Sequence, residues 1–141
     1  MDNCFRYIAV NRLNNTKNTF SYCGENGDVV SDVKGIKRLM TLADDGFSLE
    51  KGFTADKVVG KAAAYLMVYL GAKKVYAETL SKQAYTVFEK YGVDFSYKYL
   101  VPFIINRAGN DICPMEKTVI GAQNPEEAYM LLKNKLESIQ G

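Results

Sequence analysis

A short stretch, Asp56-Lys57-Val58-Val59-Gly60-Lys61, combines two lysines with a glycine. Its apolar spacing predicts a helix, on which Lys57 and Lys61 would share one face and repel by about 0.2–0.5 kcal/mol. Both would lie near the positive end of the helix dipole, and Gly60 would cost about 1 kcal/mol relative to alanine. An anion at the helix N-terminus would reverse the electrostatic terms. We therefore predict an anion-binding site at Asp56, Lys57, Gly60 and Lys61. The alternative is a solvated pair of lysines beside a tightly packed glycine.

Cys113-Pro114-Met115-Glu116 is the second stretch that could do chemistry. Proline favours the first position of a helix, which would put Cys113 at the N-cap, where the helix dipole favours a thiolate. Glu116, or Asp56 from the first stretch, could then move protons. These three residues are the candidates for catalysis. The alternative is a structural cysteine that opens a short helix, with Glu116 completing a capping box.

Asn106-Arg107 is the third stretch. A guanidinium group clamps phosphate or carboxylate through paired hydrogen bonds, so both residues are candidate ligand contacts. A turn before Gly109 explains them equally well.

The composition excludes much common enzymology, because the 141 residues include no histidine. A histidine base, a Ser-His-Asp relay and imidazole metal ligands are therefore ruled out. The three cysteines are isolated, which predicts no metal, no cofactor and a reducing cytoplasm. The 18 Lys and Arg against 16 Asp and Glu give a net charge of +2 without a dense basic run, so nucleic-acid and membrane binding gain no support.

The elements that must position these residues follow from spacing. One domain over residues 1–141 fits the length. An antiparallel hairpin is expected around Asn26-Gly27, and a helix through 36–43. The clearest pattern is a long buried helix that begins at a Thr54 cap and ends at Gly71. The remaining expected elements are a strand at 74–78, a helix from Ser81 to Gly92, a strand at 93–99 and a C-terminal helix capped by Asn124, whereas the run at 4–10 is ambiguous. Strands interleaved with helices predict an α/β fold with a mixed sheet.

Three stretches together, 52–64, 105–107 and 113–117, resemble an uncharacterised bacterial family with a cytidine-deaminase-like fold and no assigned activity. The resemblance covers about residues 18–130 and implies a three-layer α/β/α sandwich with a mixed sheet. Active deaminases hold zinc through ligands at two helix starts. The corresponding stretches here, at Thr54 and Ser81, contain none of those ligands. Zinc-dependent deamination is therefore expected to be absent.

The resemblance also implies that helix N-termini near Thr54 and Ser81 converge where the metal would sit, which leaves a pocket suited to an anion. We expect a phosphate-bearing small molecule or nucleotide there, with Lys57, Lys61 and Arg107 in contact. Two alternatives stay open. One is an enzyme that uses Cys113 as its nucleophile. The other is a structural or interaction protein, including a subunit of a homo-oligomer.

Overall fold

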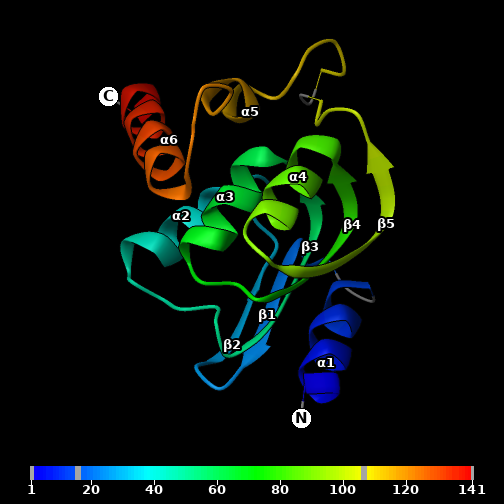
Figure 1. The fold of residues 1–141 in the computed structure, drawn as a ribbon. Helices are drawn as coiled ribbons and strands as arrows, with labels where there is room; N and C mark the ends of the chain where they lie inside the picture. Colours follow the sequence, from blue (N-terminus) through cyan, green and yellow to red (C-terminus); the bar gives the residue numbers. More distant parts are fainter. Residues whose placement is uncertain (1, 15–16, 106–107, 141) are drawn as a thin grey trace.

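A computed structural model describes residues 2–14, 17–105 and 108–140, and in these ranges six helices accompany one five-stranded sheet (Figure 1). The helices are α1 (Asp2–Asn14), α2 (Lys37–Asp44), α3 (Lys61–Tyr69), α4 (Lys82–Lys90), α5 (Pro114–Thr118) and α6 (Pro125–Gln140). The strands are β1 (Phe20–Gly24), β2 (Gly27–Ser31), β3 (Gly52–Val59), β4 (Lys74–Ser81) and β5 (Asp94–Val101). Of the described helices, none has the length and apolar character that a membrane span requires.

The sheet is mixed, as the sequence predicts. Its strands lie in the order β2-β1-β3-β4-β5. β1 runs antiparallel to β2 and β3, whereas β3, β4 and β5 run parallel to one another. The predicted hairpin is confirmed: Gly24 pairs with Gly27, and Glu25 and Asn26 form the turn between them. The positive φ that this turn requires, 112°, falls on Gly27.

Helices pack on both faces of the sheet. α1 covers β1 and β3, where Ala9 and Leu13 are fully buried against Phe53 and Ala55. The ambiguous run at 4–10 therefore belongs to a helix. On the opposite face α3 is the central helix; it contacts α2 and α4, and α6 packs against it (Figure 1).

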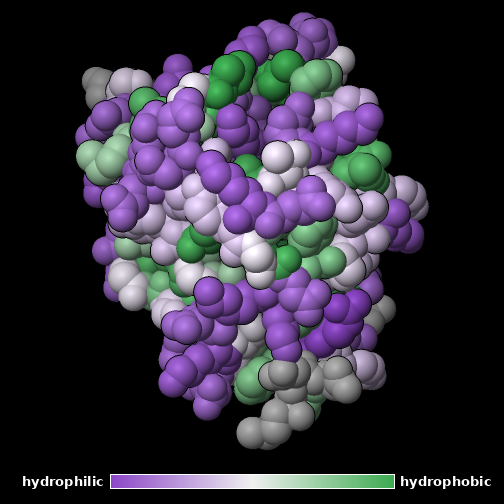
Figure 2. Space-filling model, in the orientation of Figure 1, coloured by the Kyte–Doolittle hydropathy of each residue, from purple (hydrophilic) through white to green (hydrophobic). Residues whose placement is uncertain are grey.

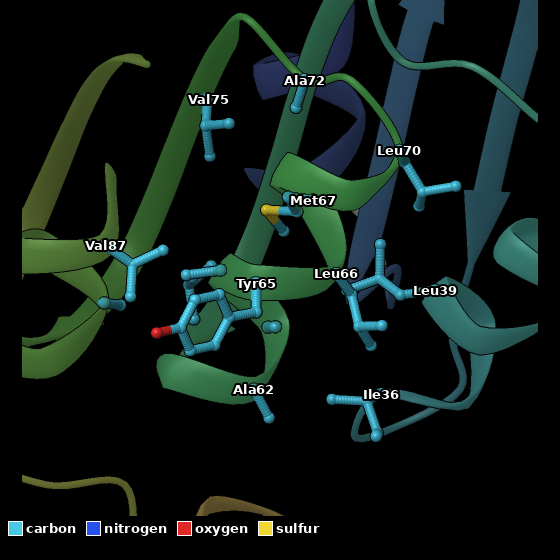
Figure 3. Packing of buried hydrophobic residues seen from close by; sticks show 14 of the residues in the cluster. Ile36, Leu39, Ala62, Tyr65, Leu66, Met67, Leu70, Ala72, Val75 and Val87 are labelled. Carbon is cyan, nitrogen blue, oxygen red and sulfur yellow. The ribbon is translucent and has the colours of Figure 1, made fainter. Parts of the chain in front are cut away.

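The buried character predicted for the helix before Gly71 is confirmed for residues 61–69. Every residue from Ala62 to Met67 in α3 is buried. Figure 3 shows Leu66 of α3 in one apolar cluster with Leu39 and Ile36. Burying this continuous surface supplies the main favourable term in folding, roughly 25 cal/mol per Å² of apolar area.

The predicted start of that helix at Thr54 is wrong, because residues 52–59 form β3. β3 lies between β1 and β4 and is covered by helices on both faces, so Phe53, Thr54 and Ala55 are buried in succession. A strand covered on both faces does not show the strict apolar–polar alternation of a half-exposed strand, and β3 does not show it either. The helix begins only after Gly60, its N-cap. Lys57 and Lys61 therefore do not share a helix face, and Gly60 does not lie inside a helix.

The helix caps predicted at Ser81 and Asn124 are confirmed. The Ser81 hydroxyl accepts a hydrogen bond from the Ala84 N–H at 3.1 Å at the start of α4. The Asn124 side-chain oxygen accepts one from the Glu127 N–H at 2.8 Å at the start of α6. Both caps satisfy backbone donors that a helix N-terminus leaves without partners.

Candidate functional site

A cavity of about 770 Å³, here called the main cavity, lies where β3 ends and α3 begins. One wall comes from β3, α3 and the residues around the start of α2; the other comes from the segment between β5 and the end of α5. Its apolar lining includes Phe20, Ile36, Leu39, Ala62, Ile104 and Met115. A volume of this size with mostly apolar walls is typical of a small-molecule site.

The main cavity brings together five of the residues that the sequence singles out. Asp56, Lys57, Gly60, Cys113 and Glu116 all line it. They come from two regions separated by more than 50 positions in the chain, so the long-range contact is a finding of the fold. Asn106 and Arg107 lie outside the described residues, although their neighbours Ile105 and Ala108 are part of the lining.

β3 places the Asp56 carboxyl group at the main cavity on the same face of the sheet as Phe20, its cross-strand partner. Asp56 is half-buried, and its Oδ1 accepts a long hydrogen bond from the Val58 N–H at 3.4 Å. Burial raises the pKa of Asp56 to about 8, and hydrogen bonds from the backbone N–H groups of Val58 and Lys57 oppose this shift. Asp56 is therefore mostly uncharged at pH 7.

Glu116 caps the N-terminus of α3. Its Oε1 accepts a hydrogen bond from the Lys61 N–H at 2.7 Å, and its Oε2 accepts one from the Ala62 N–H at 2.8 Å. The approach requires glycine at position 60, since a Cβ atom there would lie 2.1 Å from Oε1. Burial raises the pKa of Glu116, although the two N–H groups and the Lys61 charge oppose this shift.

This contact corrects the predicted role of the helix N-terminus. The anion at α3 is the chain's own Glu116 side chain, not a bound ligand. The expected convergence of helix starts at Thr54 and Ser81 is also wrong, because Thr54 lies inside β3. Glu116 completes no capping box in its own helix: Cys113, the N-cap of α5, makes no side-chain cap hydrogen bond.

Lys61 lies beside a smaller cavity of about 240 Å³ that also touches Gln83 and Glu116. Its Nζ donates to the Ile120 carbonyl oxygen at 3.1 Å and lies 5.7 Å from the centre of the Tyr65 ring. Figure 2 shows hydrophobic groups gathered in this region of the surface, where α5 and the segment after β5 lie. A ligand contact for Lys61 stays a prediction.

The lining of the main cavity also contains two cationic side chains that the sequence did not indicate. Lys34 and Arg38 line it together with Lys57. The Arg38 Nε is buried, and within the described part of the chain it has no hydrogen-bond partner. Leaving a charged donor buried without a partner is costly. No spacing signal separates Arg38 from the exposed lysines near it, because only the fold shows which side of α2 meets the cavity.

Cys113 is half-buried at the start of α5, and Pro114 takes the first helical position as predicted. The Cys113 N–H donates to the Ile104 carbonyl at 2.9 Å, which fixes the segment that carries the thiol. Among the described residues, no three His, Cys, Asp or Glu side chains lie close enough to share a metal ion.

The fold and the site thus define an α/β domain with a five-stranded mixed sheet and a cavity lined by both acids and cations. Residues 8–136 match the family described as TM1506, a domain of unknown function (DUF1893), and the chain belongs to this family. It is similar to a DUF1893 family protein (TM1506) from Thermotoga maritima of known crystal structure, with a TM-score of 0.84 and 28% sequence identity. The match covers 96% of this chain and 91% of that chain. No curated protein matches the chain.

Proposed function

We propose that this chain binds a small molecule with a phosphate or similar anionic group, such as a nucleotide, in the main cavity. The observation that carries the proposal is the buried Arg38 Nε, which lacks a partner in the described residues and belongs to a side chain that lines the cavity. A guanidinium group in such a place gains hydrogen bonds when an oxyanion binds.

The charges around the main cavity support an anionic ligand. Three cations, Lys34, Arg38 and Lys57, stand against two acids, Asp56 and Glu116. The raised pKa of Asp56, about 8, removes most of its negative charge at pH 7. The carboxylate of Glu116 is already hydrogen-bonded to two N–H groups of α3. The cavity therefore carries a net positive charge, and its apolar walls suit the uncharged part of the ligand.

We also propose a finer fold class and a cellular compartment for this chain. The strand order and the helices on both faces support a three-layer α/β/α sandwich of the cytidine-deaminase-like kind. The absence of zinc ligands in the sequence supports a function other than zinc-dependent deamination. Three isolated cysteines remain in keeping with a reducing cytoplasm.

One observation favours a second candidate, an enzyme with a cysteine nucleophile. Cys113 and Asp56 line the same cavity, so a thiol and a group able to exchange protons near neutral pH face one ligand volume. Covalent capture of Cys113 by an electrophilic nucleotide analogue, blocked by excess nucleotide and absent from Cys113→Ser, would support this reading. Binding of the nucleotide without covalent capture of Cys113 would favour the first candidate, a protein that only binds its ligand.

Titration calorimetry of Arg38→Gln and Lys37→Gln tests the proposal. Both substitutions remove one positive charge from α2, but only Arg38 lines the main cavity. The ligands are nucleoside mono-, di- and triphosphates, the matching nucleosides and inorganic phosphate. We expect wild type to bind a phosphorylated ligand, Arg38→Gln to weaken binding roughly tenfold or more, and Lys37→Gln to change it about twofold at most.

Two results would contradict the proposal. The first is a folded wild type that binds nothing in the panel. The second is a nucleoside that binds as tightly as its phosphate, since the cations would then contribute nothing.

A further inference from the structure

β5 is the last strand of the sheet and has a long unpaired edge. One edge pairs with β4, and in the described ranges no strand pairs with the other (Figure 1). Its side chains are unusually open for eight consecutive strand residues: Tyr97, Tyr99 and Leu100 are 39%, 53% and 40% exposed. An open edge of this length with apolar side chains is a template for a further strand.

The hydrogen bonds to β4 fix which residues present backbone groups at the open edge. The Asp94 N–H donates to the Lys73 carbonyl on the β4 side at 2.9 Å. Backbone direction alternates along a strand, and the β4–β5 register is constant. Phe95, Tyr97, Tyr99 and Val101 therefore point their N–H and C=O groups away from β4. An added antiparallel strand must bond to these odd-numbered positions.

A second copy of β5 meets this requirement in only a few registers, and charge selects among them. With the two-fold axis at Ser96, Asp94 stands opposite Lys98 of the other copy, so two pairs of opposite charge form. With the axis at Tyr97, Asp94 would stand opposite Leu100. With the axis at Lys98, that lysine would stand opposite its own copy and repel it. Asp94 and Lys98 are both exposed, and the described residues show no ion pair for either.

The same register also places aromatic side chains of the two copies opposite each other. The axis at Ser96 places Phe95 opposite Tyr97 of the other copy on the face that carries α4. Both rings already contact Tyr85, with centroids 4.9 and 6.0 Å away. Because Tyr85 holds these rings in place, a cross-strand aromatic pair would lose little conformational freedom when it forms.

We propose that two copies of this chain associate through β5, antiparallel and with the two-fold axis at Ser96, so that the two five-stranded sheets become one. The partner is a second copy because residues 94–98 of the strand are complementary to themselves in both charge and aromatic contacts. The dimer is independent of the ligand proposed for the main cavity.

A cysteine at the axis tests the register. Ser96 would face its own copy as a non-hydrogen-bonded pair, with Cα atoms about 4.5 Å apart, which a disulfide can bridge. In a Cys4→Ser background, Ser96→Cys should yield a disulfide-linked dimer under mild oxidation. Leu100→Cys is the matched control: it lies on the same face of β5, takes no part in the Asp94–Lys98 pairs and would be roughly 26 Å from its copy, so no cross-link is expected. Equal cross-linking of both variants would overturn the register.

Charge reversal tests the dimer itself. Sedimentation of wild type should show a species of twice the 15.8 kDa chain mass. Lys98→Asp should weaken the dimer at least about tenfold, and Asp94→Lys combined with Lys98→Asp should restore it, which also shows that the variants fold. A wild type that stays monomeric at all concentrations, or a dimer unchanged by Lys98→Asp, would overturn the proposal.

Discussion

Asp56 is an acid that the fold keeps protonated. Its partners are backbone N–H groups, and burial raises its pKa from 3.8 to about 8. The folded chain therefore binds this proton more tightly than the unfolded chain does. The contribution to stability is fully present below about pH 4 and is lost as the pH rises towards 8.

Asp56→Asn should remove that loss. We expect the difference in unfolding free energy between the variant and wild type to rise by roughly 2 kcal/mol in favour of the variant as the pH goes from 5 to 9. This value is smaller than the full pKa shift of Asp56 implies, because its side chain is only half-buried. Urea unfolding at pH 5, 7 and 9 measures the difference. Asp45→Asn, at an exposed position, is the control and should show no such trend. A constant difference between Asp56→Asn and wild type would contradict the raised pKa.

Gly60 and Glu116 form one unit, because the carboxylate occupies the space that a side chain at position 60 would need. Gly60→Ala should cost about 1–3 kcal/mol of unfolding free energy, since the new Cβ displaces Glu116 from α3. Combined with Glu116→Ala, the cost should be clearly less than additive. Gly121→Ala is the control, because a Cβ there meets nothing within 4 Å. Thermal and urea unfolding would be measured for Gly60→Ala, Glu116→Ala, the double variant and Gly121→Ala. Additive losses of unfolding free energy in the double variant would show that the contact between Gly60 and Glu116 is unimportant.

At this scale five of the residues that the sequence singles out lie together, although the reason given for two of them is wrong. Asp56, Lys57 and Gly60 do line one cavity with Cys113 and Glu116. The helix energetics that pointed to them do not apply, since Lys57 belongs to a strand. Gly60 is instead the position where a buried strand passes into a buried helix.

The elements show why that boundary was missed. A central strand covered on both faces has no alternation to reveal it, and Ala55, Val58 and Ala62 happen to keep helical spacing across the junction. The β-branched residues Val58 and Val59, followed by glycine, are the signal that favours a strand ending there. Elements with explicit caps, such as α4 and α6, were predictable because local side chains fix their starts.

The cap of α6 gives a prediction at this scale. Asn124 is exposed, so its substitution changes the cap without disturbing the core. Asn124→Ala should lower the unfolding free energy by about 1 kcal/mol, because the Glu127 N–H loses its partner. Asn124→Asp keeps an acceptor oxygen and should stay within about 0.3 kcal/mol of wild type. Equal losses in both variants, measured by urea unfolding, would mean that the cap is not what stabilises this end of α6.

At the scale of the whole molecule, α6 ties the end of the chain to the core. It packs against α3, and Leu132 is fully buried there, whereas Met130 of the same helix is 53% exposed. Leu132→Ala should lower stability by roughly 2–5 kcal/mol, and Met130→Ala by less than about 0.5 kcal/mol. Far-ultraviolet circular dichroism and tyrosine fluorescence should report one shared transition in both variants. A separate early transition in Leu132→Ala would show that α6 unfolds on its own.

The sequence predicted the α/β class and the mixed sheet because both depend on the order of elements along the chain. It could not predict the main cavity, whose walls come from distant segments. Lys34 and Arg38 illustrate the limit: nothing near them in the sequence shows that the segment before α5 lies opposite.

The cap that Glu116 provides has a consequence for synthesis. The carboxylate that completes α3 comes from 54 and 55 positions later in the chain than the two N–H groups that it binds. A ribosome therefore releases α3 well before it releases the residue that finishes the first turn. Until then water must satisfy those two donors, and α3 also lacks α6, which packs against it. Nascent chains that stop before α5 carry an incomplete central helix, so the native contacts of α3 form only after α5 and α6 have been synthesised.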